Sequence, residues 1–397
     1  MTAAMYAAVS GLKTHMNAMN VISNNVANVN TLGYKSTRYT FNEALYTTLR
    51  NGSNGNDTLG GQNPAQVGFG CSIGTIDLDM STKNYSPTGN ALDVMIDGDG
   101  FFIIGDDKEK TGITTQSALQ GMSLSRLGNF SLDANGYLVD GNGSLIYGFL
   151  RMTSVDDAEN GVNSTEEEMT SPVLTPIRMP MCYIGSNTSE DADEDDTQNV
   201  NKTKTNVIFP RIVNSGNDYY VEDGTVDSYN ENHEGSELGD DVTDKDLTRL
   251  QPSSVSIDSM GQITAITKDQ QLVVVGFIAV GMVDNPNGVT HVDGRYYSAL
   301  GGAGNLSVNT VGGAFTHIPP TGDDEVDEDE LALLGSTKLT IESAGGTEFI
   351  TGGLESSGTD LAQEITNMIV IQRGYQANTR IVTVTDSMLE ELVNMKR

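Results

Sequence analysis

The chain has 397 residues, a formal net charge of −32 and a pI of about 4.2. Nucleic-acid binding needs clustered Lys and Arg, so this charge argues against a nucleic-acid partner. The length exceeds what one hydrophobic core usually serves, and 44 Gly with no Trp indicate turn-rich, lightly cored domains.

The first thirty residues are predicted to form an amphipathic helix. Apolar residues recur there every seven positions, and such a repeat places a narrow stripe along the helix that needs a partner helix. His15 lies on this stripe, where a polar residue lowers stability and can fix register. The stripe consists of Met5, Leu12, Met19 and Val26. Asn and Gly residues that commonly end helices follow it: Asn24, Asn25, Asn28 and Gly33.

A connecting region is expected at 41–70, because residues 51–63 have the composition of a flexible linker. From residue 71 the apolar period changes to two, with closely spaced turn signals, which predicts short strands. We expect an inner β domain from 71–148 and 253–337, and an outer acidic β domain from 149–252. Residues 338–351 are expected to connect the inner domain to the C-terminal segment.

The C-terminal segment, residues 360–397, is predicted to be a second long helix. Its seven-residue stripe consists of Leu361, Met368, Tyr375, Val382 and Leu389. Asn378 and Thr385 interrupt the stripe. The two terminal helices can pair with each other or with those of neighbouring subunits, and periodicity leaves both arrangements open. The predicted fold is multi-domain α+β: a terminal α-helical coiled-coil domain from 1–40 and 352–397, with two mainly-β domains inserted.

No constellation typical of a catalytic, cofactor or metal site occurs, so an enzyme is not expected. The glycines of Asp97–Gly100 lead into another strand rather than a helix, so we interpret them as a hairpin turn. Asp133–Asp140 lacks the spacing of a calcium loop and also indicates a turn. Cys71 and Cys182 favour free thiols and leave a disulfide open. No membrane-spanning segment and no cleavable signal peptide are predicted.

Several short motifs resemble those of the bacterial flagellar rod and hook axial proteins. At the N-terminus these are AVSGL (8–12), NNVAN (24–28) and TLGYK (31–35). In the middle they are GNALDV (89–94), GDGFF (98–102) and FSLDANGYLV (130–139). Return-strand resemblances are IDSMGQI (257–263) and NPNGV (285–289), and QRGYQAN (372–378) with its Gln372 and Arg373 lies near the C-terminus. The matches cover both ends and about half the chain.

The resemblance implies export without a cleaved signal through the flagellar export apparatus, and polymerisation outside the cell. It implies an inner tube made from the terminal helices, outer layers made from the β domains, and no membrane insertion. The middle insertion favours the hook branch, whose tube acts as a universal joint between rod and filament. The implied partners are further copies of the chain, the distal rod protein, the hook–filament junction protein and the hook cap.

Two alternatives to the hook remain at this point. One is a distal rod protein that carries an insertion. The other is a secreted acidic surface adhesin that binds Ca²⁺, suggested by the acidic runs at 190–196 and 323–330. A solvated loop is the simpler interpretation of both runs.

Overall fold

The computed structural model places most of the chain in two compact units. Unit 1 comprises Met1–Met80 and Ser356–Arg397, and unit 2 comprises Ser81–Glu355. The structure describes residues 3–54, 60–105, 113, 116–152, 155–157, 162–164, 169–170, 174–185, 204–215, 218–232, 238, 242–311, 341–343 and 346–395. Both acidic runs fall outside these ranges.

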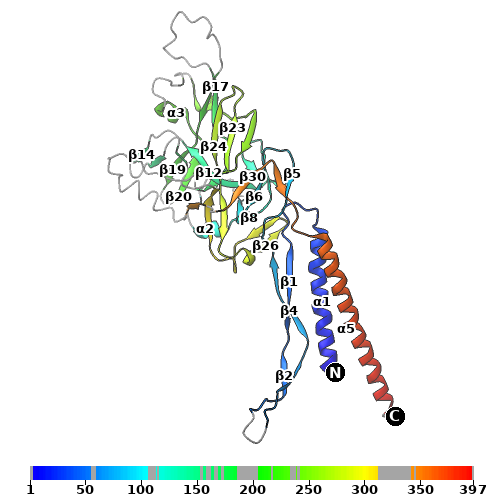
Figure 1. The fold of residues 1–397 in the computed structure, drawn as a ribbon. Helices are drawn as coiled ribbons and strands as arrows, with labels where there is room; N and C mark the ends of the chain where they lie inside the picture. The colour runs from blue at the N-terminus through cyan, green and yellow to red at the C-terminus, as the bar shows by residue number, and fades with distance from the viewer. Residues whose placement is uncertain are drawn as a thin grey trace, which may run out of the picture. The chain divides into compact units, whose positions relative to one another are not determined.

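Unit 1 is built from the two ends of the chain and a long β extension. The predicted terminal helices are present as α1 (Ala3–Ala27) and α5 (Leu361–Met395). Figure 1 shows α1 and α5 side by side and antiparallel, with the end of α5 extending past the start of α1. The strands of this unit are β1 (Thr37–Glu43), β2 (Tyr46–Arg50), β3 (Ala65–Gly68) and β4 (Cys71–Leu78).

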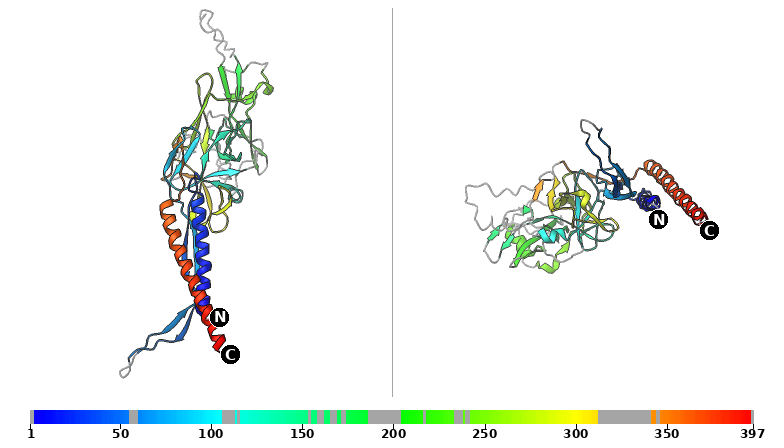
Figure 2. Two further views of the ribbon diagram at one scale, coloured as in Figure 1. Left: turned by 90° about the vertical axis from the view of Figure 1, so that its right-hand side faces the viewer. Right: turned by 90° about the horizontal axis from the view of Figure 1, so that it is seen from below.

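The strands of unit 1 form one extended antiparallel ribbon. β1 pairs with β4, and β2 pairs with β3 beyond them. Figures 1 and 2 both show β1 and β4 running along α1. Strand pairs therefore occupy much of 41–70, where a connecting region was expected from composition. Gly and Asn make that segment's composition linker-like, but Tyr46, Leu49 and Val67 give it strand-forming residues.

Unit 2 is mainly β, as the alternating pattern predicts. Its first half contains β5 (Tyr85–Pro87), β6 (Asp93–Asp97), β7 (Phe101–Gly105), α2 (Gln116–Gln120), β8 (Ser123–Ser125), β9 (Gly128–Asn129), β10 (Ser131–Leu132), β11 (Leu138–Val139), β12 (Leu145–Met152), β13 (Val155–Asp157), β14 (Val162–Ser164), β15 (Met169–Thr170), β16 (Thr175–Pro176) and β17 (Met181–Gly185).

Its second half contains β18 (Lys204–Ile208), β19 (Arg211–Ser215), β20 (Asp218–Glu222), α3 (Val226–Asn232), η1 (Asp244–Asp246), β21 (Thr248–Arg249), β22 (Ser254–Ile257), β23 (Gln262–Ile266), β24 (Leu272–Ile278), β25 (Val280–Val283), η2 (Pro286–Gly288), β26 (Thr290–Asp293), β27 (Tyr296–Ser298), β28 (Leu306–Thr310), β29 (Ile341–Ser343), β30 (Glu348–Thr351) and β31 (Gly353–Glu355).

A large sheet forms the body of unit 2. Its main path runs in the order β22-β23-β24-β12-β7-β25-β28-β29. Strands β7 and β12, which end by residue 152, thus pair with β25 and β24, which follow residue 254. The chain between residues 152 and 254 is therefore an insertion between paired strands of one sheet. The core on this sheet includes Ile104, Ile146 and Ile278, each at most 1% exposed, and the rings of Phe130 and Phe349 pack on Phe102.

A smaller core lies in the stretch expected to form the outer domain. It consists of Ile208, Val226, Tyr229, Leu238 and Leu247. Beside it, the Asp223 carboxylate accepts hydrogen bonds from two guanidinium groups, Arg178 and Arg249. These arginines come from segments that precede and follow residues 186–203, so one carboxylate ties both together.

The two turn interpretations meet different outcomes. Asp133–Gly136 joins β10 to β11, which pair with each other, so this segment is a hairpin turn. Asp97–Gly100 also turns the chain, and Gly98 and Gly100 have φ of +113° and +129°. However, β6 pairs with β30 and β9 while β7 pairs with β8, β12 and β25, so the hairpin interpretation is wrong. The turn carries the chain between two sheets.

Candidate assembly surface

The contact between α1 and α5 rests on a small apolar cluster. Ala18, Ile22 and Ile371 are nearly fully buried there, with Met19 and Met368 packed against them. Three buried side chains are few for helices of 25 and 35 residues. Because apolar burial supplies most of the free energy of helix packing, this pair is only weakly stabilised by its own core.

Two glycines let polar side chains enter this contact. A Cβ added at Gly11 would lie 2.6 Å from Asn378 Nδ2, and one added at Gly374 would lie 2.8 Å from His15 Cε1. Two of the three polar residues that interrupt the predicted stripes, His15 and Asn378, are therefore seated over a glycine of the opposite helix. A larger residue at either glycine would push the helices apart.

His15 is held in an unusually apolar setting for an imidazole. Its ring lies edge-on to Phe41, with centroids 5.7 Å apart, and its Nδ1 is buried without a hydrogen-bond partner. Burial lowers the pKa of His15 from its ordinary value of 6.5, because desolvation disfavours the charged ring. The site therefore favours neutral His15.

Asn25 joins the end of α1 to its surroundings. Its side-chain nitrogen donates to Thr37 O and to Glu364 Oε1, both at 2.8 Å. Its side-chain oxygen accepts from Tyr34 Oη and from the amide and hydroxyl of Thr37, at 3.0 to 3.1 Å. Asn25 is 1% exposed, and satisfied polar groups of this kind fix a local geometry strongly.

The segment before α5 completes the end of α1. Ser357 Oγ donates to Asn28 O at 2.8 Å, and Thr359 Oγ1 donates to Asn25 O at 3.1 Å, so the segment before α5 is hydrogen-bonded to the last turn of α1 and to the turn that follows it. Asp360 caps the start of α5 by accepting from the amides of Ala362 and Gln363. The two chain ends are therefore bonded where α1 stops and α5 begins.

The predicted motif residues divide between this junction and the surface. Asn24 Nδ2 donates a hydrogen bond to Tyr34 Oη at 3.0 Å. Asn28 Nδ2 donates a hydrogen bond to Asn24 O at 2.9 Å. Gly33 turns the chain with φ of +71°. Gln372 and Arg373 are exposed on α5, so their side chains take no part in the junction.

The predicted stripes are only partly covered within one chain. Seven of their members are half-buried: Met5, Leu12, Met19, Val26, Met368, Val382 and Leu389. Leu361 and Tyr375 are exposed, at 42% and 38%. On α5 the residues that touch α1 include Glu364, Ile371 and Asn378, which form a seven-residue repeat offset by three from the predicted one.

The rest of α5 presents apolar side chains to solvent. They are between 45% and 77% exposed: Ile365, Ile369, Val370, Ile381, Val384, Met388, Leu392, Val393 and Met395. On α1, Tyr6, Val9 and Met16 are also exposed. Surfaces this apolar mark interaction sites in native proteins. We name these exposed residues of α1 and α5 the helix surface.

The β2–β3 ribbon has an apolar face of its own. Leu45, Leu49, Val67 and Phe69 are 37% to 83% exposed, and alternation places them on one side of the ribbon. An isolated two-stranded ribbon is marginally stable in water. This face therefore also needs a cover.

The sequence analysis did not identify the two glycines that let polar side chains enter the contact between α1 and α5, nor the residues that bind Asn25. Gly11 and Gly374 stand inside helical patterns, where an interior glycine costs stability and so signals a packing role. That signal was available. No pattern points to Thr37 and Glu364 as partners of Asn25.

Metal ligands, thiols and membrane spans were each considered in the described ranges. They contain no group of His, Cys, Asp and Glu side chains placed to hold a metal ion. Cys71 and Cys182 are both free thiols. Among the residues with a described position, no helix has the length and apolar character that a membrane crossing needs.

Comparisons with known proteins point to one family. A family described as flagella basal body rod protein matches residues 5–35, and flagellar basal body rod FlgEFG protein C-terminal matches 350–395. The chain is 29% identical to the flagellar basal-body rod protein FlgG of Bacillus subtilis over 100% of both chains. It is 27% and 24% identical to the flagellar hook proteins FlgE of Borreliella burgdorferi and Treponema pallidum, again over 100% of each chain.

Proposed function

This chain belongs to the flagellar rod and hook family, and from that premise we propose that it is the structural subunit of the bacterial flagellar hook. The family is structural and belongs to the flagellum. The observation that carries the proposal is the similarity to two hook proteins over 100% of this chain and of each relative, which includes the large β unit.

The proposed subunit polymerises into a helical tube through its terminal helices. The helix surface supports this, because repeated copies would cover apolar side chains that one chain leaves in water. In this arrangement the predicted stripes form seams between subunits, and the outer acidic residues 149–252 face away from the tube axis. The tube acts as a universal joint between rod and filament.

The proposed partners follow from that place in the flagellum. They are further copies of the chain, the distal rod protein at one end, the hook–filament junction protein at the other, the hook cap during growth, and the export apparatus. Export without a cleaved signal and assembly outside the cell belong to the same proposal.

A distal rod protein is the second candidate. The full-length similarity to a protein named as a basal-body rod protein favours it. The adhesin alternative depended on acidic runs that lie outside the described residues, and the family membership gives it no support.

Deletion of the gene separates hook from rod. Basal bodies isolated from the deletion strain are examined by electron microscopy, with the full-length gene restored as a control. A hook protein predicts complete rods without hooks, and antibody against residues 81–355 should label hooks in the restored strain. Shortened rods in the deletion strain, with no antibody label on hooks, would instead support the rod candidate.

A further inference from the structure

Four Asn–Gly pairs have both residues within the described ranges, and the asparagine of each is exposed: Asn51–Gly52, Asn135–Gly136, Asn142–Gly143 and Asn287–Gly288. An asparagine followed by glycine is prone to deamidation, because glycine has no side chain to keep its backbone nitrogen away from the asparagine amide carbon. Since all four asparagines are exposed, exposure does not separate the pairs. They differ in how the glycine amide is held.

Three of the glycine amides close turns in unit 2. Each donates to the carbonyl oxygen three residues earlier, at 3.0 to 3.1 Å: Gly136 to Asp133, Gly143 to Asp140, and Gly288 to Asn285. An amide in such a bond must first leave it before its nitrogen can attack another group. The turns therefore protect these three pairs.

Further contacts hold two of the same turns in place. Asn142 Nδ2 donates to Tyr296 Oη at 3.0 Å, so the side-chain amide is bonded as well as the glycine amide. A Cβ added at Gly288 would lie 2.1 Å from Gly302 O, so the backbone there is closely packed. Neither pair can rearrange without breaking these contacts.

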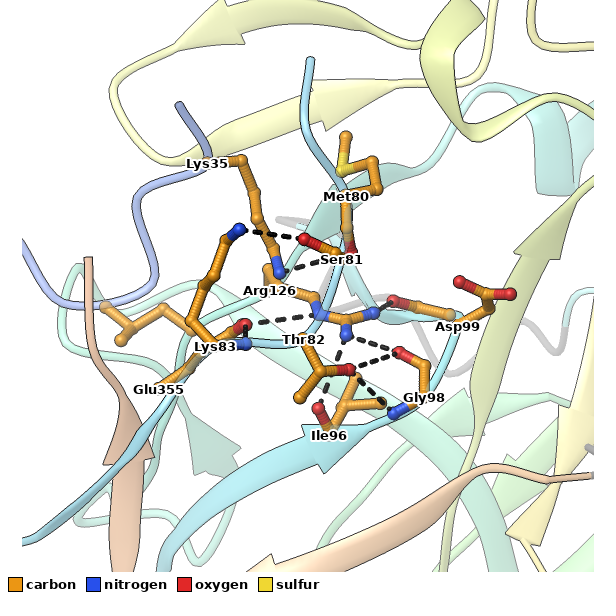
Figure 3. A network of polar contacts seen from close by, with 12 residues as sticks. Lys35, Met80, Ser81, Thr82, Lys83, Ile96, Gly98, Asp99, Arg126 and Glu355 are labelled. Carbon is orange, nitrogen blue, oxygen red and sulfur yellow. Dashed lines mark hydrogen bonds and ion pairs between the residues drawn. The ribbon is translucent and has the colours of Figure 1, made fainter. Parts of the chain in front are cut away.

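The turn between β6 and β7 protects an Asp–Gly pair in the same way. Asp–Gly forms the same ring as Asn–Gly, with loss of water in place of ammonia. The Gly98 amide donates to Thr82 Oγ1 at 3.0 Å, and Arg126 donates to the carbonyl oxygens of Gly98 and Gly100. Figure 3 shows Thr82 and Arg126 bonded to this turn. Arg126 is 3% exposed, so its bonds are shielded from water.

The Asn51–Gly52 pair in unit 1 has no comparable bonds. It directly follows β2 and precedes the bridge in which Ser53 and Gln62 exchange two backbone hydrogen bonds at 3.0 Å. Within the described part of the chain, neither the Gly52 amide nor the Asn51 side chain has a hydrogen-bond partner. The ribbon thus fixes the neighbours of this pair and leaves both reacting groups in water.

We propose that Asn51 is a site of spontaneous deamidation. The Gly52 nitrogen gives its proton to hydroxide from water and attacks Asn51 Cγ. The new N–Cγ bond closes a succinimide ring, the Cγ–Nδ2 bond breaks, and Nδ2 takes up a proton from water and leaves as ammonia. Water then opens the ring, at Cγ to give aspartate or at the backbone carbonyl to give isoaspartate. The net reaction consumes one water, releases one ammonia and transfers no electrons.

The reaction changes the end of the β2–β3 ribbon. Both products carry one more negative charge than asparagine, and isoaspartate also adds a methylene to the main chain beside the Ser53–Gln62 bridge. Because pairing depends on residue spacing, isoaspartate weakens this bridge. The site concerns unit 1 alone, so it holds for a hook protein and for a rod protein alike.

Peptide mapping by mass spectrometry of the purified full-length chain tests the proposal. The chain is incubated in a mildly alkaline buffer, once folded and once unfolded in guanidinium chloride, and fragment ions separate Asn51 from Asn54. For each pair, the folded rate is divided by the unfolded rate. We expect Asn51 to keep its unfolded rate within about two-fold. Asn135, Asn142 and Asn287 should be slowed about ten-fold, the factor expected for one hydrogen bond.

Two variants check the chemistry. Asn51→Gln would need a larger ring and should abolish the reaction at this position, whereas Gly52→Ala places a side chain beside the attacking nitrogen and should slow it several-fold. Both positions are exposed, so both variants should keep the thermal transition of the parent. The proposal is overturned if Asn51 is slowed as strongly as the three turn pairs, or if all four pairs react at their unfolded rates. An unchanged rate in Gly52→Ala would likewise exclude the Gly52 nitrogen as the attacking group.

Discussion

Unit 2 closes its own core, whereas unit 1 leaves much of its apolar surface open. In unit 2, large side chains such as Phe102, Ile104 and Ile146 are at most 1% exposed. In unit 1, three side chains form the buried cluster between two long helices, while many apolar neighbours remain in water. The difference predicts that unit 2 is stable in a single chain and, under the proposed function, that further copies would add stability to unit 1 by covering its apolar surface.

The strongest way to break this comparison is to damage each core in the monomer. Phe102→Ala removes a ring that contacts Phe130 and Phe349, with centroids 4.9 Å and 5.7 Å away, and should cost unit 2 about 3–5 kcal/mol. Ile371→Ala is the matched change in the small cluster of unit 1. We expect only Phe102→Ala to lower the main transition in thermal unfolding. Equal shifts for both would show that the units do not unfold independently.

The next effect concerns assembly rather than folding. Leu389 is half-buried on α5, and Leu389→Asp places an anion near the helix C-terminus, where the dipole disfavours negative charge. Burying a Leu side chain fully contributes about 1.5–3 kcal/mol relative to leaving it exposed. Because every subunit of a polymer carries the same change, the loss of this burial is repeated at each subunit. We expect no hooks and no motility, with the thermal transition of unit 2 unchanged.

The control for this change lies one residue away. Glu390 is exposed, so Glu390→Gln should leave hook formation and swimming unchanged. Normal hooks seen by electron microscopy in the Leu389→Asp strain would show that this part of α5 is not an assembly seam.

A smaller effect is expected at the junction of the two chain ends. Asn25→Ala leaves the Thr37 amide and one Glu364 oxygen without a buried partner, which should cost unit 1 about 1–3 kcal/mol. Hydrogen exchange of α1 and α5 amides in the monomer should speed up, while exchange in β24 stays the same. Asn20→Ala on the exposed face of α1 is the control. Unchanged exchange in Asn25→Ala would mean that the helices do not need this junction.

These variants also show how far the sequence alone leads. The seven-residue repeats place both terminal helices within a few residues, and the period of two correctly predicts that short strands follow residue 71. Periodicity identifies which residues are apolar but not what covers them, so it does not single out Glu364, Ile371 and Asn378, which touch α1 alongside Met368 of the predicted stripe. Only the folded chain shows His15 seated over Gly374, or Asn25 bound to Glu364, because those partners lie far apart in the sequence.

The turn at Asp97–Gly100 illustrates a second limit. Its glycines and the strands on each side are correctly expected from sequence, yet the strands join different sheets. Pairing depends on residues far along the chain, such as Phe349 opposite Ile96. Local turn signals carry no information about such partners.

The smallest predicted effect is a dependence of unit 1 on pH. Burial lowers the pKa of His15 in the folded chain below its ordinary value of 6.5, so the unfolded chain binds the proton more readily. The stability that neutral His15 contributes is therefore fully present above that value and is lost as the pH falls through the lower, folded pKa. Its direct neighbours, Gly374 on α5 and Phe41 on β1, carry no charge that would stabilise the imidazolium.

Hydrogen exchange of α1 and α5 should accordingly speed up, beyond the intrinsic effect of pH, when the monomer is moved from about pH 7.5 to about pH 5. His15→Gln keeps a neutral polar side chain and should remove this dependence. His291 in unit 2 is the matched control, since burial also lowers its pKa and its ring packs on Tyr297 with centroids 4.3 Å apart. His291→Gln should leave the pH response of unit 1 intact. If the pH dependence of exchange persists in His15→Gln, groups other than His15 cause it. The protonation of His15 would then not weaken the contact between the two helices.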